Sequence, residues 1–457
     1  MSSSRRGFIR AATLGPVSLA LWSQGGVAQA QGHDHGAADG DGPADCTLPV
    51  PPPAERFIPN EPRVIERISA AEMAAPGQAE RLATFRRGFE VVRAKPESDV
   101  TGWTKQIAQH CISCAGSNTH NIHYDWFFTT WHRAYLYFLE RILRKAAGDD
   151  LRLVYWNWES EASRTLPEIY APEGQSLYWA RRRLTGPNWP LSDEDVAVDA
   201  ILALPNFEDF GGTREQRNPT PAAYSGAHAN VHNAFSPGDM ANLQYSPRDP
   251  VFYAHHGNID RLWSSWSAVP GHENPDFGED RVYFYDENGV WRYTLLNDLV
   301  DTEKLGYRYS SLMVPEGQNR RAMRTLAKAR NSVAFSTAEV ATLTDSGPDF
   351  MLIQNVRNLQ LLPADATVYG IFTDDPPVGT ESRGSASFLG TMSRVLSEGH
   401  DHVDAPLSAA FNVTGKLGVR ARARAGQLSF FVAVLDDEGK TTTAAIPLVA
   451  DDIHLIQ

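Results

Sequence analysis

Cysteine, positive charge and long apolar segments are all scarce in this sequence. Its 457 residues include only three cysteines, and an odd number leaves one sulfur outside simple disulfide pairing. The formal net charge is −13 at pH 7, which disfavours nucleic acid as a partner. No segment is apolar over a length that spans a bilayer, so we expect no membrane span. The length suffices for two or three domains with a buried core.

Residues 1–30 predict a segment that directs export. The paired Arg5 and Arg6 in SRRGFIR precede a short apolar run and an AQA sequence that ends at Ala30. This order is typical of a twin-arginine signal peptide with a cleavage site. We therefore expect a bacterial protein that is periplasmic or secreted. Residues 31–45 are small and acidic, and we expect a flexible leader there.

One stretch, which begins at His110, combines metal-ligand residues with an amphipathic helix. The inward positions of that helix are spaced three or four residues apart: His132, Tyr135, Leu139 and Ile142. His123 lies nine residues before His132, on the opposite face of a continuous helix, so it can share a metal with His132 only from a loop. His110 and His120 are further candidates from the loop. Three imidazoles around one ion are common for zinc, copper or iron.

A second group of histidines follows about a hundred residues later, in HANVH and DPVFYAHHGNIDRLW. His228 and His232 are four residues apart, about 40° around a helix, which aims two rings at one ion. His255 and His256 begin another helix, and its apolar period accommodates either of them as the inward residue. Neither histidine group has a carboxylate in an obvious ligand position. This favours a pair of borderline-soft ions, with copper the best fit, over magnesium, calcium or a hydrolytic site.

The motifs, in this order and spacing, resemble the type-3 copper family of tyrosinases, catechol oxidases and hemocyanins, and most closely the plant-type polyphenol oxidases. The resemblance rests on five segments: HCISC, HYDWFFTTWHRAYLYFLERIL, VYWNWES, HANVH and DPVFYAHHGNIDRLW. It implies two copper ions, the first bound by His110, His123 and His132 and the second by His228, His232 and His256. It makes His255 a neighbour of the second ion and Asp260 a residue that orients an imidazole. His120 has no counterpart.

The same resemblance assigns the three cysteines. It implies a disulfide between Cys46 and Cys111, and a thioether between Cys114 and His123. The loop from Cys114 to His123 is shorter here than in the plant enzymes. A thioether would hold His123 in place before oxygen arrives.

The fold implied for residues 46–310 is a mainly α dicopper catalytic domain built on a four-helix bundle. Apolar and polar residues alternate on both sides of a DENG turn at about 276–296, which predicts a β-hairpin. Tyr307 and Tyr309 stand where a tyrosine motif ends the catalytic domain in the plant enzymes.

Residues 311–335 have the composition of a basic, polar linker that is open to proteolysis. From residue 336 the chain has short alternating runs separated by turn residues, typical of a β-sandwich. Residues 336–457 resemble the C-terminal domain that covers the copper site in the plant enzymes and keeps them latent until it is moved or cut.

The resemblance implies oxidation of o-diphenols to o-quinones, with dioxygen as co-substrate and small phenols as substrates. Family members with strong monophenol activity have a glutamate and an asparagine at positions that hold Tyr224 and Ala229 here, while Asn230 and Asn233 are displaced. Leu243 aligns with the bulky gate residue over the second copper. We therefore expect diphenol oxidation and leave tyrosinase-type monophenol hydroxylation undecided.

Three other functions share parts of this pattern. An o-aminophenol oxidase differs only in substrate. A hemocyanin-like oxygen carrier would have the same six histidines, but carriers depend on large assemblies. A dizinc hydrolase would normally have bridging carboxylates and a general base among its ligands. The sequence does not determine the oligomeric state.

Overall fold

The computed structural model describes residues 46–49, 51–115, 121–186, 188–215, 219–313, 321, 323–330, 332–334, 349–396, 405–417 and 427–456. The predicted signal peptide, the leader, His120 and residues 314–320, 322, 331 and 335 of the predicted linker lie outside the described residues. Residues 44–457 form one compact unit. Division of this unit into a catalytic domain, a linker and a C-terminal domain stays a prediction.

The first part of this unit is helical. Its helices are α1 (Ala70–Met73), α2 (Ala79–Arg93), α3 (Trp103–Ala115), α4 (Phe127–Ala147), α5 (Val198–Leu202), α6 (Phe207–Gly211), α7 (Ala229–Asn233) and α8 (Val251–Ala268). Helix α4 packs against α2 and α8, and its side chains are buried on almost every face from Phe128 to Leu143. Such all-round burial marks a central helix. None of the helices in the described part of the chain has the length and apolarity to cross a bilayer.

Helix α8 runs unusually close to the segment that contains VYWNWES. The backbone N–H of Trp156 donates to the carbonyl of Ala254, 2.9 Å away. A Cβ atom on Gly257 would lie 2.7 Å from the carbonyl oxygen of Val154, so only glycine allows this approach. The close contact brings Trp158 of this segment against His255 in the first turns of α8.

Short strands tie the ends of the helical part together. β3 (Arg281–Tyr285) pairs antiparallel with β4 (Trp291–Leu295) in the region where a hairpin is expected. β1 (Glu55–Arg56) adds parallel to β4, and β2 (Ile65–Arg67) pairs parallel with β5 (Tyr307–Tyr309). The N-terminal segment is thus joined to the end of the predicted catalytic region.

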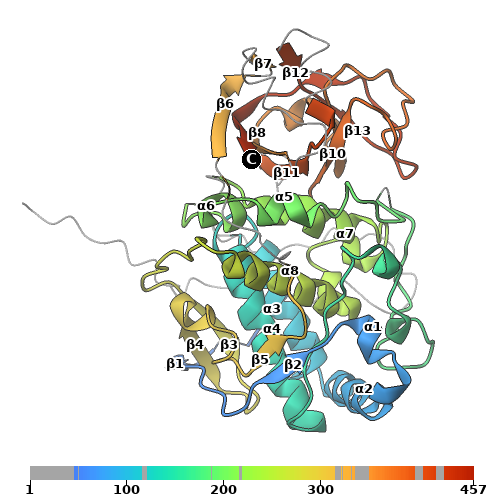
Figure 1. The fold of residues 1–457 in the computed structure, drawn as a ribbon. Coiled ribbons are helices and arrows are strands. Elements are labelled where there is room, and N and C mark those ends of the chain that lie inside the picture. Colours follow the sequence, from blue (N-terminus) through green and yellow to red (C-terminus); the bar gives the residue numbers. More distant parts are fainter. Residues whose placement is uncertain are drawn as a thin grey trace, which may run out of the picture. The chain divides into compact units, whose positions relative to one another are not determined.

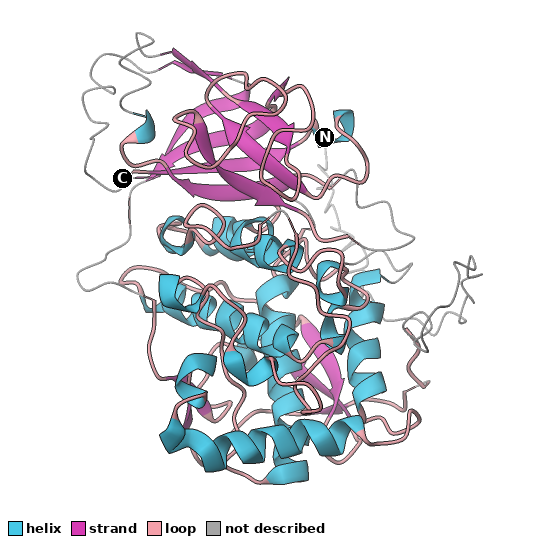
Figure 2. Ribbon diagram, turned by 90° about the vertical axis from the view of Figure 1, so that its right-hand side faces the viewer, coloured by secondary structure: helices cyan, strands magenta, loops and turns pink. Residues whose placement is uncertain are grey.

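The C-terminal part is rich in sheet (Figures 1 and 2). Its strands are β6 (Met323–Arg330), β7 (Ser332–Ala334), β8 (Phe350–Val356), β9 (Val368–Phe372), β10 (Phe388–Ser393), β11 (Leu407–Asn412), β12 (Gln427–Ser429), β13 (Phe431–Val434), β14 (Ile446–Pro447) and β15 (Ala450–Ile456). Two four-stranded antiparallel sheets have the orders β11-β8-β15-β6 and β10-β9-β13-β14. β6 lies within the range predicted as linker. The predicted mainly α class therefore describes only the first part of the chain.

The sheets contact the helical part directly. β11 packs against α5, and β10 packs against α7 and the turn before it, η4 (Tyr224–His228). In Figure 1, α5 lies beside β11. The helices and sheets share one hydrophobic cluster, in which Ile201 of α5 and Ala409 of β11 are both buried. His228 of η4 and His232 of α7 therefore lie close to a contact between the two parts.

Candidate metal centre

The six histidines of the predicted ligand sets lie together in the interior, each at most 2% exposed. They come from separate elements: His110 from α3, His123 from the loop before α4, His132 from α4, His228 from the end of η4, His232 from α7 and His256 from α8. Packing of these elements, and not proximity in sequence, gathers the imidazoles.

The second histidine set converges most closely. The ring centroids of His228 and His232 are 4.6 Å apart, as expected for residues on adjacent turns. The Nε2 atoms of His232 and His256 are 3.3 Å apart. Two imidazole nitrogens bound to one ion at about 2.0–2.1 Å with tetrahedral angles lie about 3.3 Å apart. The spacing therefore fits joint ligation of one ion.

Backbone carbonyls fix the tautomers of three of these imidazoles. Nδ1 lies near a carbonyl oxygen in His132 (2.6 Å from Phe128), His228 (3.2 Å from Tyr224) and His232 (2.6 Å from Met240). A carbonyl oxygen only accepts, so each Nδ1 carries the proton and each Nε2 keeps a lone pair. The Nε2 atoms of His132 and His228 are buried without a hydrogen-bond partner. Lone pairs of this kind are suited to a metal ion.

His255 is also part of this cluster, but its hydrogen bond differs. The four histidines 228, 232, 255 and 256 have ligand atoms within 4.8 Å of one another. The indole Nε1–H of Trp158 donates to Nδ1 of His255, 3.2 Å away. An indole only donates, so Nδ1 of neutral His255 is an occupied acceptor and Nε2 carries the proton. His255 then has no free lone pair, which leaves His256 as the ligand candidate of the pair.

The first histidine set is looser. The ring centroids of His110 lie 5.5 Å from those of both His123 and His132, and the His123 and His132 centroids are 5.1 Å apart. The buried thiol of Cys114 lies beside them, with Sγ 3.4 Å from Nε2 of His110 and 4.0 Å from Nε2 of His123. The closest ligand group here is therefore His110, Cys114 and His123.

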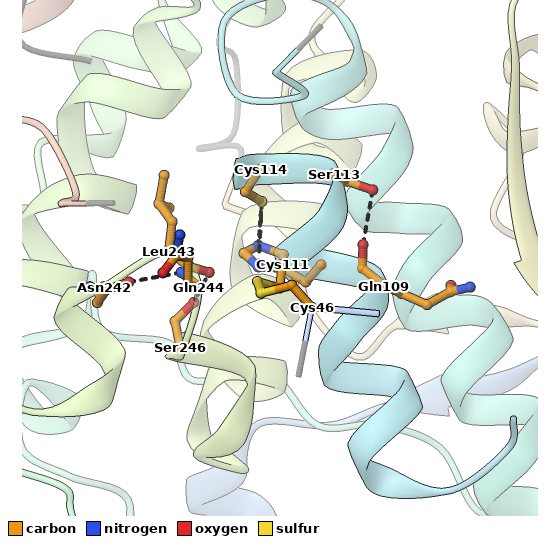
Figure 3. Close-up of a disulfide and its surroundings, with 10 residues drawn as sticks. Cys46, Gln109, Cys111, Ser113, Cys114, Asn242, Leu243, Gln244 and Ser246 are labelled. Atoms are coloured by element: carbon orange, nitrogen blue, oxygen red, sulfur yellow. Dashed lines mark hydrogen bonds between the residues drawn. A yellow bond between two sulfur atoms is a disulfide. The ribbon is translucent and has the colours of Figure 1, made fainter. Parts of the chain in front are cut away.

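A disulfide joins Cys46 to Cys111, the pairing that the resemblance implies (Figure 3). Cys111 and Cys114 both lie on α3, one turn apart, and Cys114 is not in a disulfide. The disulfide anchors the N-terminal segment to the helix that carries His110. The thiol of Cys114 is thereby left beside His123, the partner predicted for a thioether.

Burial keeps the imidazoles uncharged. It lowers the pKa of His132 to about 3 and that of His232 to about 4. Burial, followed by the neighbouring imidazoles, also lowers the pKa of His110, His228 and His256 well below the ordinary value. Neutral imidazole is the form that binds metals, so the environment suits ligation.

The predicted pocket residues are all buried, but they face different partners. Tyr224 lies against the rings of His123 and His228, with centroids 5.5 and 5.3 Å away. Ala229 is buried at the start of α7. The amide of Asn233 donates to the carbonyl of Arg394, 2.9 Å away, and so points toward the C-terminal part. The backbone N–H of Leu243 donates to the carbonyl of Leu396, 2.8 Å away.

Asp260 does not take the role expected for it, because its carboxylate binds no imidazole. It accepts from Arg67 and Arg133 and from the hydroxyls of Tyr307 and Tyr309. Burial alone would raise the pKa of Asp260, but the two guanidinium groups hold it below the ordinary value. Asp260 is one turn from His256 in sequence, but its partners are Arg67 of β2, Arg133 of α4 and the two tyrosines of β5.

Two functional neighbours were missed from the sequence. One is Trp158, whose N–H determines the tautomer of His255. Asn121 accepts from the backbone N–H of His123 through Oδ1, 2.9 Å away, and the same oxygen is 3.1 Å from Nδ1 of that histidine. An asparagine two residues before a ligand histidine is a recognisable turn signal. Nothing local marks Trp158.

Two adjoining sets of buried imidazoles with no carboxylate among them are suited to a dinuclear metal centre with nitrogen ligands. Residues 100–186 and 180–269 match the common central domain of tyrosinase, so this part of the chain contains a tyrosinase-family domain. The chain is 27% identical over 366 residues to the chloroplastic polyphenol oxidase of Vitis vinifera, covering 68% of this chain and 59% of that protein. It is 30% identical over 354 residues to the chloroplastic polyphenol oxidase of Malus domestica, covering 66% and 58%.

The chain thus spans less than two thirds of the length of these curated relatives. Among solved structures, the Grenache (Vitis vinifera) polyphenol oxidase is 28% identical, with a TM-score of 0.53 over 61% of this chain and 94% of that one. The latent apple tyrosinase is 20% identical, with a TM-score of 0.63 over 88% and 99%. That likeness shows a shared fold, which includes both a helical core and a C-terminal sheet-rich region.

Proposed function

We propose that this chain is a type-3 copper polyphenol oxidase that oxidises o-diphenols to o-quinones with dioxygen. The observation that carries the proposal is the set of lone pairs on buried, neutral imidazoles, above all the Nε2 atoms of His232 and His256, 3.3 Å apart. The tyrosinase-family domain makes copper the expected ion.

The proposed ligands are His110, His123 and His132 for one copper ion and His228, His232 and His256 for the other. We expect the helices that carry them, α3, α4, α7 and α8, to act as a four-helix bundle. A thioether between Cys114 and His123 is part of the proposal. It is supported by a thiol that is buried beside that imidazole and not used in a disulfide.

When bound, the copper pair supplies the capacity to pass two electrons from a diphenol to dioxygen. The protein keeps the ligand nitrogens unprotonated and excludes water from them. Aromatic rings hold the imidazoles in orientation: Phe252 packs on His256 with centroids 4.1 Å apart, and Phe128 packs on His228 at 4.8 Å. Backbone carbonyls hold the Nδ1 protons away from the substrate side.

We expect diphenol oxidation to predominate, because Tyr224 and Ala229 replace the residues associated with strong monophenol activity. Tyr224 cannot replace the glutamate as a base. Burial raises the pKa of its hydroxyl well above the ordinary value, so the hydroxyl stays protonated. Leu243 is the proposed gate residue. Export by the twin-arginine route from a bacterial cell, and latency imposed by the C-terminal part, complete the proposal.

Oxygen uptake by the copper-loaded chain tests it, first with catechol and then with tyramine, before and after limited proteolysis within residues 314–320. We expect uptake with catechol. Uptake with both substrates would make the protein a tyrosinase, and uptake restricted to o-aminophenol would make it an aminophenol oxidase. Reversible oxygen binding with no uptake in any state would refute oxidase activity and favour an oxygen carrier.

A further inference from the structure

His232 lies on helix α7 and His228 on the η4 turn before it, and neither element is long enough to maintain its own position. α7 has five residues, and the turn before it, η4, contains a break in helical geometry at Gly226 (φ −89°, ψ −126°). One turn of helix contributes few backbone hydrogen bonds and is unstable in isolation. Other contacts must therefore keep the imidazoles of His228 and His232 close to that of His256.

Asn230 provides the principal contact, and two of its three partners lie in the C-terminal part. It is two residues from each histidine, so at about 100° per residue its side chain leaves α7 on the side opposite to both imidazoles. Its amide nitrogen donates to the carbonyl of Asp195, 2.8 Å away, and to Oγ1 of Thr391, 3.0 Å away. Its amide oxygen accepts from the hydroxyl of Ser393. Asn230 is 1% exposed, so no water substitutes for these partners.

The partners of Asn230 also bind one another. Thr391 of β10 donates to Oδ1 of Asp195, 3.0 Å away, and Arg383 donates to Oδ2 of the same carboxylate, 2.8 Å away. The Asp195 carboxylate is fully buried and thus joins a loop of the helical part to two places in the C-terminal part. Networks of satisfied, buried hydrogen bonds are rigid and specify one arrangement.

Two more contacts continue along the same segment. Asn233 donates to the carbonyl of Arg394, and the N–H of Leu243 donates to the carbonyl of Leu396. Between them lies Met240, whose carbonyl accepts from Nδ1 of His232, 2.6 Å away. The chain from residue 230 to residue 243, which orients His232 from both sides, is therefore fastened to residues 391–396 at three points.

We infer that β10 and the residues after it are a structural support of the second metal-binding histidine pair, with Asn230, Thr391 and Ser393 as positioning residues. The C-terminal part is then an integral component of the metal centre and not merely a removable cover. The inference rests on the proposed function in one respect only, namely that the bound metal is copper. The two roles predict different results when the contact between residues 230–243 and 391–396 is weakened. If the C-terminal part is only a cover, the oxidase activity should rise. If it is a support, the chain should lose metal.

The test uses the full chain with Thr391→Val, which removes the hydroxyl while keeping the shape, and Thr391→Ser, which restores it. Gln354→Ala is the matched control. Gln354 of β8 donates to Asp209 of α6, 2.6 Å away, so this change weakens a contact between the same two parts far from α7 in the hydrogen-bond network. Copper retained against a chelator is measured over time, and hydrogen exchange of the peptide spanning residues 228–243 is measured on the metal-free chain.

We expect T391V to lose one of two copper ions about tenfold faster than the wild type, a typical loss for a group that supports a ligand. Its 228–243 peptide should exchange faster, while T391S and Q354A match the wild type in both measurements. Unchanged exchange and copper retention in T391V, with higher catechol oxidation, would overturn the inference in favour of a cover. If the wild type binds no copper, the proposed function fails, while hydrogen exchange still decides the question of support.

Discussion

The imidazole rings of His132 and His256 stack on each other, with centroids 4.3 Å apart and planes 13° from parallel. His132 belongs to α4 and His256 to α8, two helices that pack together. His132 also lies 5.1 Å from His123, and His256 lies 5.1 Å from His228. The stack therefore joins the two predicted ligand sets into one buried cluster of imidazoles.

Adjacent histidines at the start of α8 should differ in their effect on metal binding. We expect His256→Ala to reduce the copper content from two ions to one per chain, because it removes a lone pair near Nε2 of His232. His255→Gln should retain two ions, because Trp158 already occupies the acceptor nitrogen of His255. Metal analysis after gel filtration measures both. Loss of copper in the His255 variant, with retention in the His256 variant, would reverse the assignment.

The proposed thioether predicts a specific peptide chemistry. Trypsin should release residues 106–133 as one peptide that contains Cys111, Cys114 and His123. After reduction and alkylation of copper-loaded protein, only Cys111 should be alkylated. The peptide should be lighter by two hydrogen atoms than the same singly alkylated peptide with a free Cys114 thiol. Mass spectrometry of wild type beside Cys114→Ser decides this. A doubly alkylated wild-type peptide would mean that Cys114 stays a free thiol.

Removal of the Asp260 carboxylate should destabilise the fold. Asp260→Ala leaves the buried guanidinium groups of Arg67 and Arg133 without their shared anion, which costs about 3–5 kcal/mol of unfolding free energy. Denaturant unfolding of the metal-free chain measures this loss. The matched control is Glu66→Ala, whose partner Arg308 is exposed, and there we expect a change of at most about 1 kcal/mol. Equal effects of the two variants would contradict the prediction.

Asp209 should make the free energy of unfolding depend on pH between about 4 and 6. Burial raises its pKa from 3.8 to about 6, aided by Glu208 and Asp452 and opposed by hydrogen bonds from Asn206 and Gln354. The folded state therefore holds the proton more tightly than the unfolded state. Its stabilising effect is complete below about pH 4 and is lost as the pH rises through 6.

Asp209→Asn mimics the protonated form and should abolish this dependence. Relative to wild type, we expect the variant to gain on the order of 2–3 kcal/mol above pH 7 and nothing at pH 4. Unfolding midpoints of both proteins from pH 4 to pH 8 provide the comparison. A constant difference across that range would show that Asp209 does not titrate near 6.

Local patterns predicted much of the helical part and of the ligand sets. The stripe through His132 lies on α4, and four-residue spacing brings the rings of His228 and His232 within 4.6 Å. The disulfide between Cys46 and Cys111 follows the pairing implied by the family resemblance. Asp260 was misassigned, because its sequence distance from His256 says nothing about the two arginines that approach it from other elements.

The sequence by itself determined which side chains can bind metal and excluded carboxylates from the centre, since residue type and local spacing are properties of the chain alone. Helical periodicity left His255 and His256 open, and the tertiary structure favours His256, because the N–H that occupies His255 belongs to Trp158, 97 residues away in sequence. The tertiary structure alone placed Ser393 against Asn230, across 163 residues. Helical periodicity constrains neighbours within a few turns, whereas hydrogen bonds between distant segments exist only after those segments have packed.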